Sequence, residues 1–192
     1  MGEHGEKEVV IRPARRQDVP AMAELINGYA AQGLMLPRSE EQITRYLPDF
    51  VVAELDGAIV GCAALARLSP DLAEIRSLAV SPEAQGRGIG RALVNFLLAA
   101  AREAGIAQVC ALTLRPRFFE NIGFQVVDRW EISPKIWQEC IYCDKFHRCD
   151  EVAMLMNLEA AHATAQQAHV EEYLRECVPM AWRRNFAAAM RH

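Results

Sequence analysis

The chain lacks any apolar run of the roughly 18–20 residues that a helix needs to cross a bilayer. Its first eight residues are polar and charged, so they also lack the apolar stretch of a secretory signal peptide. Positive charge is not in excess, because 25 acidic residues outnumber 21 basic ones and the net charge is −4. That balance argues against a nucleic acid as a partner. We therefore expect a cytoplasmic protein that acts without a membrane or a nucleic acid.

Disulfides are also not expected, although the chain has six cysteines, because cytoplasmic cysteines are usually thiols or metal ligands. The 192 residues are 52% hydrophobic and 24% charged, which is ordinary for a globular protein with a full core. That length fits one domain with an appendage. We find neither an internal repeat nor a low-complexity linker.

Turn and capping signals divide the chain into short helices and strands. Asp18 is placed to cap a helix over residues 19–31, which Gly33 ends. Ser39 and Gln42 form a capping box for a helix through residue 47. Asp56-Gly57 signals a hairpin between two apolar runs. Strands are expected over residues 9–11, 50–55, 58–67, 74–80, 107–114, 124–132 and 151–158, and further helices over 91–103 and 117–121. Hairpins combined with a crossover helix predict an α/β (α+β) fold with a mixed sheet.

One turn carries more chemistry than the others. The strand over residues 74–80 leads into Gly86, Gly88 and Gly90, and a helix follows at once. Such a turn can direct several backbone N–H groups at one point, and the start of the helix adds unpaired N–H groups and the positive end of its dipole. Glycines have no Cβ, so a ligand can approach the backbone closely. With Arg87 and Arg91 nearby, the segment predicts a phosphate or pyrophosphate site.

Two common phosphate loops are excluded by their spacing. No Gly-Lys-Ser or Gly-Lys-Thr follows the glycines, and the Gly-x-Gly-x-x-Gly dinucleotide fingerprint is absent. Gln85-Gly86-Arg87-Gly88-Ile89-Gly90 instead resembles the acetyl-CoA loop of the GCN5-related N-acetyltransferases (GNAT), whose pattern is Gln/Arg-x-x-Gly-x-Gly/Ala after a strand. The resemblance covers residues 9–158. It implies a GNAT domain there, with a mostly antiparallel mixed sheet flanked by helices. The Ala-rich segment over residues 159–192 is helical in pattern and is expected to form a helical extension.

The resemblance also implies roles in acetyl transfer from acetyl-CoA. Backbone N–H groups of Leu78, Ala79 and Val80 are expected to stabilise the oxyanion, since family members often bulge this strand. Glu74 is expected to act as the general base, directly or through water. Its alternative role is that of a solvated strand residue or a partner of Arg76. The cofactor-binding residues implied are Leu78, Ala79, Val80, Gln85, Gly86, Arg87, Gly88, Ile89, Gly90, Arg91 and Asn121.

The usual acid for the leaving group is missing. Many members carry a tyrosine where this chain has Phe119, and phenylalanine donates no proton. The thiolate of coenzyme A is then expected to leave unaided or through water. Asn121 either hydrogen-bonds the cofactor or ends its helix, and Phe118 and Phe124 are expected in the core.

Several stretches further resemble the catalytic domain of N-acetylglutamate synthases, which act in arginine biosynthesis: residues 11–14, 33–39, 112–115 and 134–156. This likeness implies L-glutamate as the acceptor, with Arg12, Arg38, Ser39 and Arg148 on the acceptor side. Guanidinium groups bind carboxylates bidentately, although Arg38 and Arg148 can also be surface residues. Pro116 stands where longer synthases have a serine that assists the thiolate. The alternatives are an acetyltransferase for another small amine and a non-catalytic acyl-CoA sensor.

A cysteine-rich stretch follows near the end of the predicted domain. Cys140, Cys143, His147 and Cys149 are four possible ligands for a tetrahedral zinc, although their spacing is tighter than in a zinc finger. Packed thiols in a substrate-side loop and a redox role are the alternatives. The cysteines at 62 and 110 fall in apolar strands and are expected in the core.

The last segment has an amphipathic pattern. Trp182, Phe186 and Met190 recur every four residues, with arginines between them. This face is expected to pack on the domain, to pair with a second copy in a homodimer, or to contact another partner.

Overall fold

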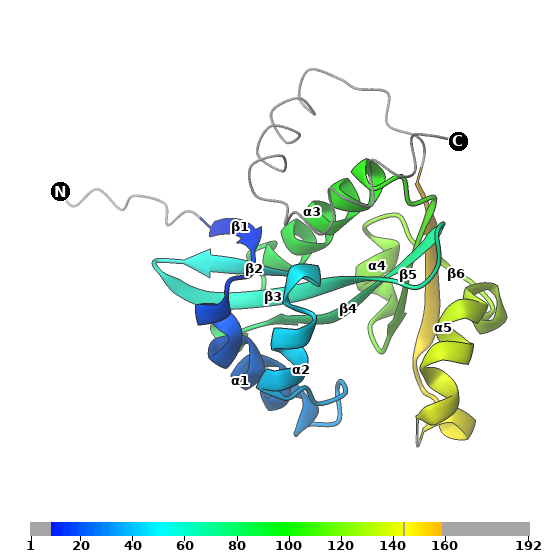
Figure 1. Ribbon diagram of the computed structural model, residues 1–192, viewed down its shortest axis with the longest axis horizontal. Coiled ribbons are helices and arrows are strands. Elements are labelled where there is room, and N and C mark those ends of the chain that lie inside the picture. The colour runs from blue at the N-terminus through cyan, green and yellow to red at the C-terminus, as the bar shows by residue number, and fades with distance from the viewer. Residues whose placement is uncertain (1–8, 144, 159–192) are drawn as a thin grey trace. The chain divides into compact units, whose positions relative to one another are not determined.

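The computed structural model describes residues 9–143 and 145–158, which contain a seven-stranded sheet in the order β1-β2-β3-β4-β5-β7-β6 (Figure 1). The strands are β1 Val9–Pro13, β2 Phe50–Leu55, β3 Ala58–Arg67, β4 Leu72–Val80, β5 Gln108–Thr113, β6 Gln125–Val126 and β7 Val152–Asn157. The α-helices are α1 Val19–Ala30, α2 Glu40–Arg45, α3 Ile89–Glu103, α4 Pro116–Glu120 and α5 Ser133–Gln138. No helix in this part of the chain is long and apolar enough to cross a membrane. The predicted extension over residues 159–192, with its candidate dimer face, lies outside the described residues.

The described residues divide into two compact units. The first unit comprises residues 9–64 and 77–96, and the second comprises residues 65–76, 97–143 and 145–158. Strands β3 and β4 and helix α3 each contribute residues to both units.

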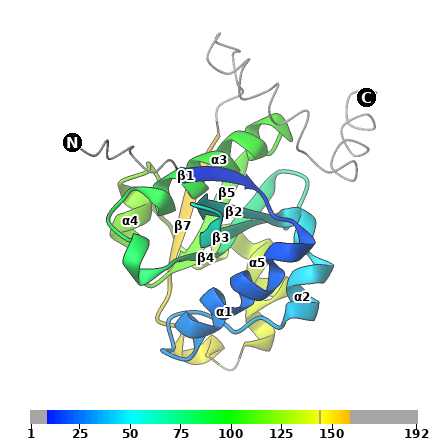
Figure 2. The same cartoon turned by 90° about the vertical axis from the view of Figure 1, so that its left-hand side faces the viewer.

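In the first unit, helices α1 and α2 cover one face of strands β2 and β3 (Figure 2). The cluster between them includes the fully buried side chains of Met22, Ile26, Ile43, Val52 and Cys62. Helix α3 lies against the other face, where a Cβ on Gly61 would come within 3.1 Å of a Leu93 methyl group. The same Cβ would lie 3.2 Å from the carbonyl oxygen of Ala79, so glycine at this position allows the close approach of α3.

Local signals in the first unit form the turns that they predict. Asp56 and Gly57 join β2 to β3 with φ angles of 52° and 79°, both in the left-handed region that a two-residue type I′ hairpin requires. The Ser39 hydroxyl accepts a hydrogen bond from the Gln42 backbone N–H at 3.1 Å. In return, the Gln42 side chain accepts from the Ser39 N–H at 2.9 Å. The predicted hairpin and capping box are therefore both confirmed.

The second unit contains a parallel pairing of strands. Strand β4 runs parallel to β5, with Leu72 opposite Gln108, whereas β5 and β7 are antiparallel, with Gln108 opposite Asn157. The predicted mixed, mostly antiparallel sheet is thus confirmed. A hydrophobic cluster of the second unit includes Leu72, Cys110, Ile132 and Leu155.

The long strand expected over residues 124–132 is wrong. Strand β6 covers only Gln125–Val126, and a 3₁₀ turn follows at Arg129–Ile132. Asp128 causes the change, because its carboxylate accepts from the Trp130 N–H at 2.9 Å and the Glu131 carboxylate accepts from the Asp128 N–H at 3.1 Å. This second capping box starts a helical turn where an extended strand was expected. Helix α5, which follows directly, was not predicted.

Candidate functional site

The predicted cofactor loop joins β4 to α3 in the first unit. Gly86 and Gly88 have φ angles of 76° and 78°, which is the left-handed region that favours glycine. The loop from Gln85 to Gly88 is exposed, and a Cβ on either glycine would meet no atom within 4 Å. The Ala92 N–H donates to the Gly88 carbonyl at 3.0 Å, which sets the start of the α3 hydrogen-bond ladder. Helix geometry then leaves the N–H groups of residues 89–91 without an intrahelical acceptor, as an anion site needs.

Hydrogen bonds to β3 and α1 hold the start of this loop in place. The Ser81 N–H donates to the Val60 carbonyl oxygen at 2.8 Å and holds the end of β4 on β3. The Tyr29 hydroxyl on α1 donates to the Val80 carbonyl oxygen at 2.5 Å. Gln85 Nε2 donates to the same tyrosine hydroxyl at 2.6 Å and to the Val80 carbonyl oxygen at 3.3 Å. Gln85 therefore ties the loop to α1, in addition to any contact with a cofactor.

Sequence reasoning missed Tyr29 as a residue that positions the loop. The available signal was its hydroxyl, because a partly buried tyrosine usually finds a hydrogen-bond partner. The identity of that partner depends on bringing together residues 51 positions apart in the chain, so it required the tertiary structure.

Strand β4 is distorted just before the predicted oxyanion donors. Ser77 has a φ of 53°, which interrupts the regular alternation of side chains along the strand. Its carbonyl oxygen lies 3.7 Å from the Cys62 thiol, which donates to it. This is the kind of irregularity that the family resemblance implied. The role of the N–H groups of Leu78, Ala79 and Val80 as oxyanion donors stays a prediction.

We expect Gly88→Val to raise the KM for acetyl-CoA more than tenfold. Valine at a φ of 78° carries a strain of about 1–2 kcal/mol, and its side chain would fill the open space above the loop where the diphosphate is expected. Steady-state kinetics with varied acetyl-CoA measure the effect. Gly105→Val is the matched control, because Gly105 also has a positive φ and open surroundings but lies after α3. An equal KM change in the control would contradict the loop assignment.

Arg38 lies in the segment between α1 and α2, and its main chain is held on both sides by Asn27. Asn27 Oδ1 accepts from the Arg38 N–H at 3.0 Å, and Asn27 Nδ2 donates to the Arg38 carbonyl oxygen at 2.9 Å. The Arg38 side chain is half-buried, and no described residue forms a hydrogen bond or ion pair with its guanidinium. Arg38 is thus available to bind a carboxylate. The neighbouring Ser39 hydroxyl caps α2, so its predicted substrate contact would compete with that bond.

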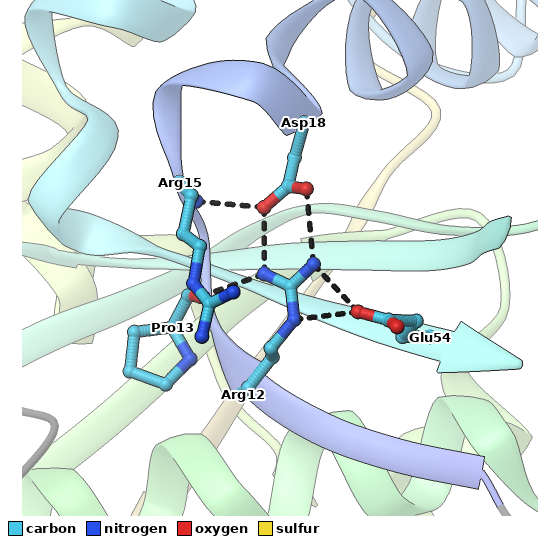
Figure 3. A network of polar contacts seen from close by, with 5 residues as sticks. All are labelled: Arg12, Pro13, Arg15, Asp18 and Glu54. Atoms are coloured by element: carbon cyan, nitrogen blue, oxygen red, sulfur yellow. Dashed lines mark hydrogen bonds and ion pairs between the residues drawn. The ribbon is translucent and has the colours of Figure 1, made fainter. Parts of the chain in front are cut away.

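Arg12 has a different role from the one predicted (Figure 3). Its guanidinium donates to both carboxylate oxygens of Asp18, at 2.7 and 3.0 Å, and to Glu54 at 2.7 Å. The arginine side chain is buried. Hydrogen bonding to Asp18, only partly offset by burial, raises the pKa of Arg12 above its ordinary value. All three guanidinium nitrogens are engaged internally, so Arg12 braces β1, β2 and the start of α1, and this geometry does not support its predicted role as a substrate ligand.

In the second unit, Glu74 is buried on β4 and forms an ion pair with Lys135 of α5. The Lys135 Nζ donates to Glu74 at 2.9 Å and to Glu139 at 2.5 Å, and Arg76 donates to Glu139 at 2.7 Å. Burial raises the pKa of Glu74 above its ordinary value, although Lys135 opposes this. Glu74 is therefore not the solvated residue of the alternative interpretation. Lys135 and Glu139 were missed because nothing in the sequence pairs them with β4.

The remaining predicted site residues of the second unit, Asn121 and Arg148, are exposed at turns. Asn121 follows α4, where its N–H donates to the Arg117 carbonyl at 3.1 Å, so it ends that helix. Arg148 lies in a 3₁₀ turn and is exposed. Phe119 is buried, with edge-to-face contacts to Phe118 and Phe124 at centroid distances of 5.1 and 5.2 Å. The cofactor and substrate roles of Asn121 and Arg148 stay predictions.

The predicted zinc site is not supported by the geometry. Among residues 9–143 and 145–158, no three His, Cys, Asp or Glu side chains are grouped so that they could hold a metal ion. Burial raises the pKa of the Cys140 thiol to about 11. The ring of His147 instead packs edge-on against Phe146 at 5.1 Å. Cys62 and Cys110 are buried, which confirms them as core residues.

Comparisons with known proteins agree with this geometry. The acetyltransferase (GNAT) domain family matches residues 47–126. An uncharacterized N-acetyltransferase of Chlorobaculum tepidum is 41% identical over 151 residues, which is 79% of this chain and 97% of that protein. An amino-acid acetyltransferase of Mycobacterium tuberculosis is 38% identical over 133 residues, which is 68% of this chain and 76% of that protein.

Solved structures show a similar fold. The structure of N-acetylglutamate synthase from Neisseria gonorrhoeae, complexed with coenzyme A and N-acetyl-glutamate, matches with a TM-score of 0.70 and 32% identity. The match covers 80% of this chain and 36% of the gonococcal chain, so the likeness concerns one part of that longer protein.

Proposed function

The chain belongs to the GNAT family and is an acetyl-CoA-dependent amino-acid N-acetyltransferase, and we propose that its acceptor is the α-amine of L-glutamate. The observation that carries the proposal is Arg38, whose main chain is held in place while its guanidinium has no partner among the described residues. Glutamate has two carboxylates, and a guanidinium binds a carboxylate with two parallel hydrogen bonds. The gonococcal synthase bound to N-acetyl-glutamate supports the same acceptor.

The reaction is a direct attack of an amine on a thioester. The ammonium group must lose a proton before its nitrogen can form a bond to the acetyl carbon, and we assign that proton to Glu74, directly or through water. The C–S bond then breaks, the thiolate of coenzyme A leaves, and the nitrogen loses its second proton to the thiolate or to water as the amide forms. The pKa of the coenzyme A thiol is near that of a cysteine thiol, ~8.5, so departure without an acid at the buried Phe119 position is chemically reasonable. Backbone N–H groups of β4 would stabilise the oxyanion between these steps.

The decisive experiment is a thiol-release assay with acetyl-CoA and each amino acid in turn. We expect glutamate to give the largest kcat/KM, and mass spectrometry to show an N-acetylated product. A reaction without acceptor corrects for hydrolysis, and spermidine and an aminoglycoside represent acceptors that suit acidic sites. Preference for a cationic amine, or for an amino acid without a second carboxylate, would contradict the proposal.

Arg38→Ala is expected to raise the KM for glutamate while leaving the KM for acetyl-CoA unchanged. A charge-assisted hydrogen bond contributes about 1.5–3 kcal/mol, so the increase should be roughly tenfold or more. Arg45→Ala is the matched control, because Arg45 lies in the next helix and its ion pair with Glu41 is exposed. Equal effects of Arg38→Ala on both substrates would argue against a carboxylate contact.

A further inference from the structure

The end of helix α1 is connected to both predicted substrate-binding segments of the first unit. Asn27 and Tyr29 lie two residues apart in its last turn, and both side chains are half-buried. Each makes its hydrogen bonds to a segment distant in the sequence: Asn27 to Arg38, and Tyr29 to Val80 and Gln85. The glycine loop and the Arg38 segment thus share one support.

The helix end itself is well defined. Gly33 has a φ of 73°, its N–H donates to the Ala30 carbonyl at 2.9 Å, and the Leu34 N–H donates to the Tyr29 carbonyl at 3.1 Å. These two bonds form a Schellman motif, which closes a helix and fixes the direction of the chain that leaves it. The segment leading to Arg38 therefore starts from a fixed point, and Asn27 fixes it again at its far end.

The Asn27 contact has a specific consequence for Arg38. An amide side chain that donates to one backbone carbonyl and accepts from the same residue's N–H restrains the position of that main chain. It does not use the guanidinium, so the charged end of Arg38 stays available. Binding then costs less entropy, because the main chain that carries the guanidinium is already ordered.

The Tyr29 contact acts in the same way on the other segment. Its hydroxyl both donates and accepts, so it links the last residue of β4 to the first residue of the glycine loop. The carbonyl of Val80 and the amide of Gln85 are thereby held together across Pro82–Ala84, the 3₁₀ turn between them.

We propose that Asn27 and Tyr29 are positioning residues, and that the last turn of α1 fixes the acceptor-binding arginine through the first and the acetyl-CoA loop through the second. This inference rests on the proposed function for Arg38 and the loop. It makes the effects of the two residues separable, because each acts through a different segment.

The test compares Asn27→Ala, Tyr29→Phe and the control Gln32→Ala by steady-state kinetics. Gln32 lies just after α1, and its Nε2 donates only to the exposed Gly28 carbonyl at 2.9 Å. We expect Asn27→Ala to raise the KM for the amino acid about tenfold and Tyr29→Phe to raise the KM for acetyl-CoA by about the same factor, as lost hydrogen bonds of this kind usually do. The control should match the wild-type enzyme. Loss of kcat alone, or equal KM changes for both substrates in each variant, would overturn the proposal.

A double variant separates positioning from general damage. If Asn27 acts through Arg38, then Asn27→Ala should have no further effect on the amino-acid KM in an Arg38→Ala background. Full additivity would overturn the proposal.

Asn27→Asp is a second variant that can be used if the alanine variant does not fold. It keeps the side-chain oxygen that accepts from the Arg38 N–H and loses the group that donates to the Arg38 carbonyl. Its KM for the amino acid should therefore lie between those of the wild-type enzyme and Asn27→Ala. If the wild-type enzyme prefers another amino acid, the proposal that glutamate is the acceptor is wrong. The same variants, measured with the preferred amino acid, still test whether the end of α1 positions the two segments.

Discussion

Glu74→Gln is expected to lower kcat by about 10²–10⁴, the usual contribution of a general base. The carboxylate must be ionised to accept the proton of the ammonium group, so the wild-type rate should fall as the pH falls through the pKa of Glu74. Burial raises that pKa above its ordinary value. The acidic limb of the wild-type pH–rate profile should therefore lie at a higher pH than an exposed glutamate would give. The Glu74→Gln variant should lack this limb. The measurement is kcat/KM against pH.

Glu139→Gln is the matched control for this prediction. It makes the same change of charge and contacts the same lysine, but Glu139 is the more exposed carboxylate, at 38% against 5% for the Glu74 side chain. Its effect on kcat should be small. A variant of Glu74 that keeps the wild-type rate and pH profile would exclude it as the base, and another group or water would then have to take the proton.

Lys135→Met is expected to reduce stability by about 3–5 kcal/mol, because it leaves the buried Glu74 carboxylate without its ion-pair partner. For a chain of this length, the fall in Tm should be roughly 10 °C, measured by calorimetry or circular dichroism.

Lys135 also opposes the rise in the Glu74 pKa. Its removal should raise that pKa further, so the acidic limb of the activity profile should move to higher pH.

Lys145→Met is the comparison for the lysine prediction, since Lys145 is exposed in the same region and its loss should change stability by less than about 0.5 kcal/mol. An unchanged Tm for Lys135→Met would mean that the ion pair contributes little to the fold. An unchanged pH profile in a folded Lys135→Met variant would mean that the lysine does not control the ionisation of Glu74.

The features predicted correctly depend on contacts between residues close in the sequence. The Asp56-Gly57 hairpin, the Ser39 capping box and the end of α1 at Gly33 each involve a few neighbouring residues whose chemistry permits one main conformation. The glycine loop belongs to the same class, since its left-handed φ angles follow from its residue types. The mistaken strand over residues 124–132 also had a local cause. The capping box of Asp128 and Glu131 is visible in the sequence and indicates a helical turn there.

The roles of the charged residues could not be predicted in this way. Arg12 resembles a substrate ligand in the sequence, yet it pairs with Glu54, 42 residues away, and with Asp18 in a buried network. Glu74 forms its ion pair with Lys135, which lies 61 residues away in the sequence. A guanidinium or carboxylate has the same chemistry whether it binds a ligand or another side chain, so its role depends on which partner the fold places within hydrogen-bond distance.

The sequence by itself determined the order of most elements, the turns, the mixed sheet and the left-handed glycines of the loop, because propensities, caps and glycines act over a few residues. Only the tertiary structure decided that Arg12 is a structural brace, that Arg38 keeps its guanidinium available, that Tyr29 holds the loop and that Glu74 is buried against Lys135. The physical reason is that burial and pairing of polar groups arise from long-range packing, which the local pattern of the chain does not specify.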